Sequence, residues 1–93
     1  MIECKNLEEV RQNIDRIDRE IVGLMAERSR YVKQAARFKK TDADVKDTKR
    51  VEEVIARVRT LAIEQGLPPG IVEDAYRAMI SGFIGYEMRE RRR

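Results

Sequence analysis

Residues 7–40 read LEEVRQNIDRIDREIVGLMAERSRYVKQAARFKK and contain the strongest helical pattern of the chain. Its core-facing positions recur at alternating steps of three and four, which is the spacing of one helical face. That series is Leu7, Val10, Ile14, Ile17, Ile21, Leu24, Arg28, Tyr31, Ala35 and Phe38. Asn6 and Glu9 have the spacing of an N-cap and its N3 partner. We therefore predict one amphipathic helix over residues 7–40, about 50 Å long.

A helix of this length is too long for its own domain. A chain of 93 residues has a compact radius of gyration of about 12 Å, so the helix must project beyond it. The exposed stripe then has to be buried against another molecule. Because a second copy of the chain is the simplest partner, we predict a homodimer.

The remainder of the chain predicts two more helices. Residues 40–48 are polar apart from Val45 and are interpreted as a loop. A second helix is expected over residues 48–65, with Gly66 at the C′ position and the stripe Val51, Val54, Val58 and Leu61. After a Pro-Pro-Gly turn, a third is expected from residue 70, with the inner face Val72, Ala75, Tyr76, Met79, Ile80, Phe83, Ile84 and Glu87. The fold class is all-α, as a single domain over residues 1–93.

Composition excludes several classes of protein. Charged residues form 40% of the chain and aromatics 5%, which suits helices with solvated outer faces. Cys4 has no partner for an internal disulfide, and neither a secretory signal nor an apolar run of about 20 residues is present. We expect a cytoplasmic protein that does not bind membranes. The net charge of +3 is spread along the chain, so the basic tail of residues 89–93 is interpreted as a solvated helix end, and nucleic-acid binding is not expected.

Three charged residues interrupt or adjoin the apolar faces: Arg28, Lys39 and Glu87. In a helix continuing through residue 40, Lys39 lies on the same face as Arg28, about 16 Å further along. Two separated cations suit a small dicarboxylate, since a guanidinium clasps one carboxylate and an ammonium provides a point charge. The structural alternatives are an Arg28 that reaches water or pairs across the seam, a solvated Lys39, and a Glu87 paired with an arginine.

Arg11 adds a cation at a distance. It lies 17 positions before Arg28, which places it about 25 Å along the axis and turned by about 100°. It therefore cannot serve the same site within its own chain. In a crossed or antiparallel pair of helices, Arg11 of the partner subunit can reach the site around Arg28.

The order of these residues resembles that of the all-helical chorismate mutases. The resemblance runs from Leu7 to about Arg89 and depends on the spacing of Arg11, Arg28 and Lys39. It implies an intertwined dimer of three-helix chains with two equivalent sites, each completed by an arginine of the other chain. Arg28 and Arg11 of the partner subunit would hold the two carboxylates of the substrate, and Lys39 would face its ether oxygen.

The resemblance also assigns residues beyond the first helix. Asp47 matches the loop aspartate of the family and Arg50 its helix-two arginine, while Phe83 is expected to line the site. Glu87 occupies the place where many members carry a glutamine that contacts the ether oxygen. A glutamate can donate there only when protonated, so we expect activity to increase toward mildly acidic pH.

One position separates two reactions. Many mutases have a glutamate directly after the helix-two arginine, whereas this chain has Val51. The related isochorismate pyruvate lyases, which make salicylate and pyruvate, tend to have an apolar residue there, while Asp47 favours a mutase. The predicted function is cofactor-free and metal-free conversion of chorismate to prephenate, with the lyase as the alternative and an amino-substituted chorismate still open as substrate. A noncatalytic helical dimer or nucleic-acid-binding module is the rival from another class.

Overall fold

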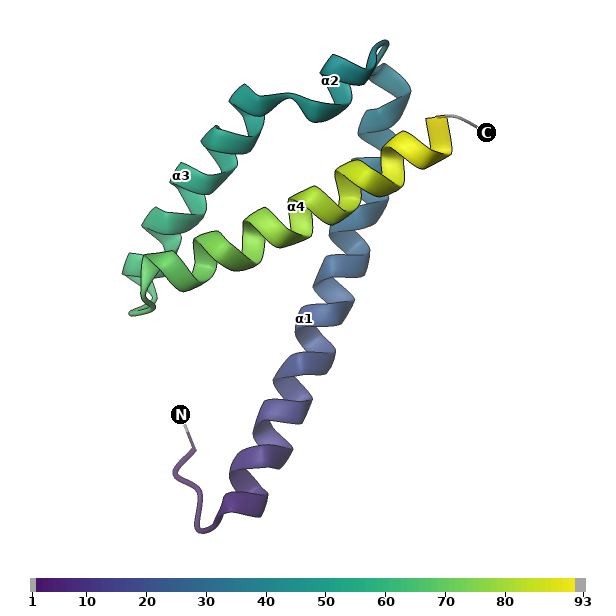
Figure 1. Cartoon of the computed structure of the whole chain (residues 1–93). Coiled ribbons are helices and arrows are strands. Elements are labelled where there is room, and N and C mark those ends of the chain that lie inside the picture. Colours follow the sequence, from purple (N-terminus) through teal and green to yellow (C-terminus); the bar gives the residue numbers. More distant parts are fainter. Residues whose placement is uncertain (1, 92–93) are drawn as a thin grey trace. The chain divides into compact units, whose positions relative to one another are not determined.

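The computed structural model describes residues 2–91. Its elements are α1 (Leu7–Ala35), the 3-10 helix η1 (Ala36–Phe38), α2 (Asp42–Lys46), α3 (Thr48–Glu64) and α4 (Pro69–Arg91) (Figure 1). Every element in this part of the chain is helical, which confirms the all-α prediction. None of these helices is both long and apolar enough to cross a bilayer. Arg92 and Arg93 of the predicted basic tail lie outside the described residues.

The start of α1 follows the predicted capping pattern. The Asn6 side-chain oxygen accepts a hydrogen bond from the backbone N–H of Glu9 at 2.9 Å. The Glu9 carboxylate in turn accepts from the N–H of Lys5 at 2.9 Å. These contacts satisfy backbone donors that a helix N-terminus otherwise leaves unpaired. They confirm the predicted start at residue 7.

The apolar stripe of α1 is uncovered. Throughout Leu7–Ala35 no side chain is buried. The exposed apolar residues on the predicted stripe are Leu7, Val10, Ile14, Ile17, Ile21, Leu24 and Tyr31. Two compact units divide the chain, one up to Val32 and one from Lys33 onward. The first unit therefore consists of an N-terminal segment and most of a helix whose apolar face needs a partner.

The first helix ends earlier than predicted. The α-helix stops at Ala35, and after η1 the backbone of Lys39 is extended, with φ −95° and ψ 126°. In a continued helix the N–H groups of Lys40 and Thr41 would donate to carbonyls four residues back. Here both donate to the carboxylate of Asp44, at 2.9 and 3.1 Å. The prediction of a helix to residue 40 is therefore wrong, because Asp44 takes these donors out of the helical ladder.

The predicted loop contains a short helix of its own. Thr41 and Asp44 form a capping box, in which the Thr41 hydroxyl accepts from the N–H of Asp44 at 3.1 Å and the Asp44 carboxylate accepts from the N–H of Thr41. The N–H groups of Lys40 and Thr41, which both donate to the Asp44 carboxylate, hold the pKa of that carboxyl below its ordinary value of 3.8, and the Lys40 contact contributes most. The buried Val45 anchors this helix, which packs against α4. The expectation of an unstructured loop over residues 40–48 is corrected accordingly.

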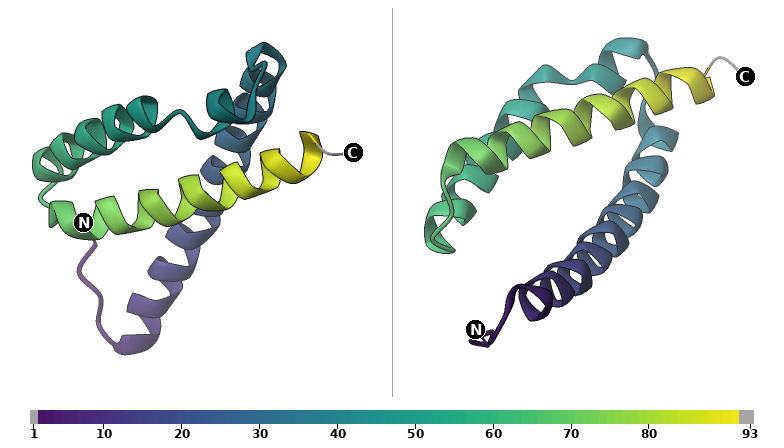
Figure 2. Two further views of the ribbon diagram at one scale, coloured as in Figure 1. Left: turned by 45° about the horizontal axis from the view of Figure 1, so that its top comes forward. Right: turned by 60° about the horizontal axis from the view of Figure 1, so that its bottom comes forward.

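The second unit is built on the hairpin of α3 and α4, which lie side by side in all the views (Figure 2). Gly66 joins them with φ 76°, the left-handed conformation predicted for the C′ position. The N–H of Leu67 donates to the carbonyl of Ala62 at 2.8 Å and completes a Schellman motif. The buried hydrophobic side chains of the unit are Val45, Val54, Ile55, Val58 and Ala62.

The buried face of α3 differs from the predicted stripe at its end. Leu61 is exposed, whereas Ile55 and Ala62 are buried. Residues 54, 58 and 62 are four positions apart and form one row of side chains, of the kind that packs into the groove of a neighbouring helix, and residue 55 lies beside this row. Leu61 lies outside the row. The prediction that Leu61 belongs to the core is therefore wrong.

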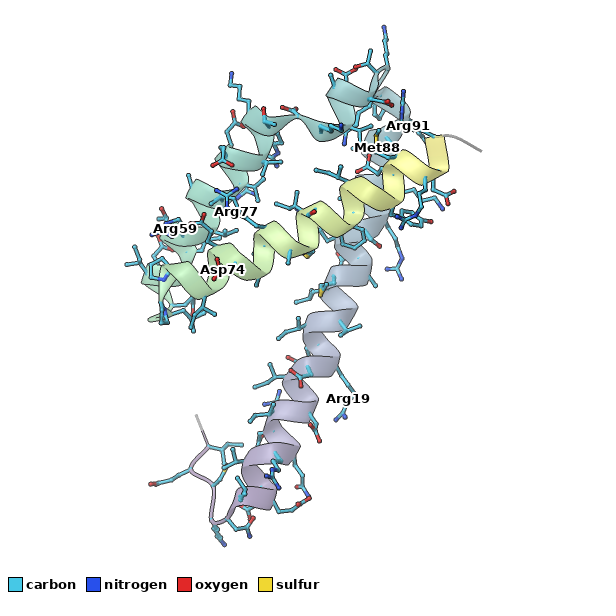
Figure 3. All side chains as sticks on the ribbon, in the orientation of Figure 1. Arg19, Arg59, Asp74, Arg77, Met88 and Arg91 are labelled. Atoms are coloured by element: carbon cyan, nitrogen blue, oxygen red, sulfur yellow. The ribbon has the colours of Figure 1, made fainter. Side chains whose placement is uncertain are left out.

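Four charged residues join the two arms of the hairpin. The guanidinium of Arg77 on α4 forms two hydrogen bonds to Glu52 on α3, both at 2.9 Å, and one to Glu73 at 2.7 Å. Arg59 on α3 donates to the other oxygen of Glu73 at 2.7 Å. Figure 3 labels the two arginines, one on each arm. The hydrogen bonds from Arg77 lower the pKa of both carboxyls, and Arg59 adds to the effect at Glu73.

Candidate active site

Lys39 lies where the chain leaves η1 and turns toward α2. Its backbone N–H donates to the carbonyl of Ala36 at 3.2 Å, which closes the last 3-10 turn. Because α1 ends at Ala35, the prediction that Lys39 extends the helical face of Arg28 is wrong. The extended backbone of Lys39 instead directs its side chain to α4.

On α4 the ammonium of Lys39 meets the carboxylate of Glu87. The distance from Nζ to Oε2 is 3.3 Å, and the two residues are 48 positions apart in sequence. Glu87 is the one buried residue of α4, with 6% of its side chain exposed, while Lys39 retains 25%. A buried carboxylate is costly unless it is paired. The pair therefore accounts for the glutamate that interrupts the apolar face of α4.

Asp47 and Arg50 lie together at the beginning of α3. Asp47 is the N-cap of that helix, and its Oδ1 accepts a hydrogen bond from the backbone N–H of Arg50 at 3.1 Å. The Arg50 side chain is more than half exposed and has Glu53 at 3.9 Å. Asp47 thus has a local structural role in addition to the predicted role in substrate binding.

Two further predicted site residues, Val51 and Phe83, come from the two arms of the hairpin. Each is half-buried, Val51 in the first turn of α3 and Phe83 four residues before Glu87 on α4. Residues four apart lie on the same side of a helix, so Phe83 neighbours the carboxylate along α4. The apolar side chain of Val51 offers no hydrogen bond to a bound ligand.

Both arginines predicted to bind carboxylates belong to α1. Arg28 is half-buried and Arg11 is exposed, and both lie in the first unit, whereas Lys39 and Glu87 lie in the second. The structure of the second unit thus brings together the predicted pair of Lys39 and Glu87. The roles predicted for Arg11 and Arg28 stay predictions.

Two contacts beside Lys39 were missed in the sequence. The Thr41–Asp44 capping box had a readable signal, a threonine followed three positions later by an acidic residue. Arg91 had no such signal in the sequence, and we interpreted it as part of a solvated tail. Its guanidinium donates to the carbonyls of Lys39 and Lys40 and to the carboxylate of Asp42, about fifty positions earlier.

Comparison with known proteins identifies the family of the chain. Residues 10–88 match the family model described as chorismate mutase type II. The chain is also similar to a protein named isochorismate pyruvate lyase from Pseudomonas aeruginosa, with 33% identity over 87 residues that cover 94% of this chain and 86% of that protein. The matched region includes every residue predicted for the site. With nearly its whole length matched, this all-helical chain belongs to the chorismate mutase type II family.

Proposed function

We propose that this protein converts chorismate to prephenate, as a homodimer with two shared sites. The observation that carries the proposal is the Lys39–Glu87 pair, in which an ammonium is held 3.3 Å from a buried carboxylate. The resemblance assigns these two residues to the ether oxygen of the substrate. Family membership supports the substrate class.

The rearrangement is unimolecular: the ether C–O bond breaks while a C–C bond forms, and no atom leaves the molecule. It requires neither a nucleophile nor an electron acceptor. Catalysis consists of holding the flexible side chain of the substrate over its ring and stabilising the negative charge that develops on the ether oxygen. In the proposed mechanism Arg28 and Arg11 of the partner subunit hold the two carboxylates, and Lys39 provides the stabilising charge.

Glu87 completes the proposed mechanism as a hydrogen-bond donor. In its protonated form it would donate to the same ether oxygen as Lys39, whereas in its ionised form it pairs with the ammonium. Phe83 and Val51 would line the ring of the substrate, and Asp47 and Arg50 would contact its polar side. No metal or cofactor has a step in this reaction.

A second candidate is the cleavage of isochorismate to salicylate and pyruvate. The similar Pseudomonas aeruginosa protein carries the name of that activity, and Val51 stands where many mutases have a glutamate. In this reaction the same ether bond breaks, and a ring hydrogen moves to the methylene carbon of the leaving enolpyruvyl group. The demand on Lys39 is the same, since charge again develops on the ether oxygen.

The decisive experiment incubates the protein separately with chorismate and with isochorismate and quantifies prephenate, salicylate and pyruvate. Prephenate formed with the higher kcat/KM supports the mutase. Salicylate and pyruvate formed in equal amounts, with little prephenate, would identify a lyase and overturn the proposal. Inactivity toward both substrates would contradict an enzyme of either kind and favour the noncatalytic dimer.

Replacement of Lys39 tests which group carries the reaction. We expect Lys39→Ala to lower kcat by a factor of about a hundred to a thousand, the usual loss for one preorganised donor to a developing charge. The matched control is Lys40→Ala, because Lys40 is the adjacent lysine and is exposed. Steady-state kinetics and far-UV circular dichroism measure turnover and folding. Near-normal turnover in folded Lys39→Ala would contradict the assignment.

A further inference from the structure

The C-terminal turn of α4 contacts the segment that carries Lys39. Arg91 donates from Nη1 to the Lys39 carbonyl at 3.5 Å and from Nη2 to the Lys40 carbonyl at 3.3 Å. Its Nε donates to the Asp42 carboxylate at 3.1 Å. One guanidinium therefore binds three acceptors within four consecutive residues. Figure 3 labels Arg91 at the end of α4.

The carbonyls of Lys39 and Lys40 lack the hydrogen-bond donors that a continued helix would provide. They follow the last turn of η1, where helical carbonyls no longer meet N–H groups from the next turn. A planar guanidinium presents several N–H groups in a fixed fork, which suits neighbouring acceptors better than a single ammonium. The amides of the same segment are already bound, since Lys40 and Thr41 donate to Asp44. Arg91 thus satisfies the carbonyl side of a turn whose N–H side is satisfied by α2.

The contacts of Arg91 and of Glu87 come from the same side of α4. The two residues are four positions apart, so their side chains lie one turn from each other. Glu87 holds the ammonium of Lys39, and Arg91 holds its main-chain carbonyl. Lys39 is consequently bound to α4 through both its side-chain ammonium and its main-chain carbonyl. Without the main-chain contact, only one ion pair at 3.3 Å would restrain a long and flexible side chain.

We propose that Arg91 is a positioning residue, which fixes the backbone of Lys39–Asp42 so that the Lys39 ammonium stays beside the reacting ether oxygen. This inference rests on the proposed function. Arg91 itself does not touch the substrate. Its loss therefore acts through Lys39 and reduces stabilisation of the transition state more than binding of the ground state.

The test compares Arg91→Ala with Arg89→Ala. Arg89 lies on the same helical end and carries the same charge, but within residues 2–91 it makes no hydrogen bond or ion pair. We expect Arg91→Ala to lower kcat about tenfold, with KM changed by less than about threefold, and Arg89→Ala to leave both unchanged. Arg91→Lys should restore part of kcat, because one ammonium can reach some of the three acceptors.

Asp42 provides a second variant of the same contact. Asp42→Ala removes one acceptor of Arg91 and leaves the two carbonyls, so its effect on kcat should be smaller than that of Arg91→Ala. Combined with Arg91→Ala it should add almost nothing, because both changes break the same interaction. Additive losses in kcat would contradict a shared contact.

Hydrogen exchange provides a readout that is independent of activity. We expect amide exchange across residues 40–46 to be faster in Arg91→Ala than in the wild type, and unchanged in Arg89→Ala. Equal losses of kcat in the two variants, or a lower kcat in Arg91→Ala without faster exchange, would overturn the proposal. Wild-type inactivity toward both substrates would refute the proposed function, whereas unchanged exchange in Arg91→Ala would refute the contact itself.

Discussion

At the scale of single residues, the candidate site depends on how one buried carboxylate is compensated. Glu87 has 6% of its side chain exposed, and its partner Lys39 comes from 48 positions earlier in the chain. In the proposed mechanism a bound substrate would share the Lys39 ammonium with this carboxylate. In that mechanism the protonation of Glu87 would set both the charge and the number of hydrogen-bond donors that face the ether oxygen.

Glu87→Gln tests this dependence. Because a carboxyl donates a hydrogen bond only when protonated, wild-type kcat/KM should rise toward mildly acidic pH. The glutamine amide donates at every pH, so the variant should have a flatter profile and a higher rate at neutral pH. The measurement is kcat/KM as a function of pH for both proteins. An unchanged profile in Glu87→Gln would give Glu87 a structural role alone.

At the scale of elements, the α3–α4 hairpin holds the site through both its apolar face and its charges. Val54, Ile55 and Val58 are buried, and the Arg77 guanidinium joins Glu52 of one arm to Glu73 of the other. The ion pairs at Arg77 are exposed and salt-sensitive, so burial supplies most of the stability.

The charged contacts make the hairpin sensitive to acid. The pKa values of Glu52 and Glu73 are lowered below 4.5, because Arg77 donates hydrogen bonds to both carboxylates. Their stabilisation is therefore complete above pH 4.5 and is lost as pH falls through the lowered values in the folded protein. We expect the urea midpoint of the wild type to fall in that range, and that of Glu52→Gln/Glu73→Gln to fall less steeply.

The control for the acid experiment is Glu64→Gln, on the same helix as Glu52. Glu64 is exposed and makes no ion pair among the residues that the structure describes. Its replacement should leave the pH dependence of the urea midpoint as in the wild type. All proteins are compared at one concentration, because self-association contributes to apparent stability. A double variant with the wild-type dependence would exclude this network as the cause of acid sensitivity.

At the scale of the whole molecule, the proposed dimer depends on the apolar stripe of α1. Its 29 residues carry an apolar stripe with no buried side chain, and Ile14, Ile17 and Ile21 are each more than two-fifths exposed. A continuous apolar surface of this kind marks an interface. In the proposed dimer the stripe is covered by the second chain, and each site receives Arg11 from the partner subunit.

Mixing two inactive variants tests the shared site. Arg11→Ala and Arg28→Ala should each be inactive as homodimers, because every site lacks one arginine. If the two are unfolded and refolded together, half of the dimers contain both kinds of chain, and each of these has one complete site. We expect activity to recover to about a quarter of the wild-type value. Recovery is measured as prephenate formation after refolding.

Two further variants control for assembly. Ile17→Glu, added to both arginine variants, places a charge on the apolar stripe. It should prevent dimerisation and the recovery of activity on mixing, since an unpaired buried carboxylate is unfavourable. Gln12→Glu in the same two variants adds the same charge about 140° around the helix from Ile17, and should allow both dimerisation and recovery. Sedimentation velocity gives the oligomeric state. No recovery in a mixture that forms mixed dimers would contradict the exchange of Arg11 between chains.

Features that depend on neighbouring residues could be predicted from the sequence. Periodicity and caps predicted an all-α chain, the start of α1 at Leu7, a second helix over residues 48–65 that is one residue longer than α3, and the left-handed Gly66, because these follow from contacts within about four residues. The charged exceptions also identified Lys39 and Glu87 as candidates for the site.

The contacts that these candidates make became known from the tertiary structure. It joined the Lys39 ammonium to Glu87 and the Lys39 carbonyl to Arg91, which lie 48 and 52 positions away in sequence. No local pattern specifies such contacts, because they depend on the packing of α2 against α4. Side chains about fifty positions apart interact only where the folded chain brings them close together, and the order of residues alone does not specify that proximity.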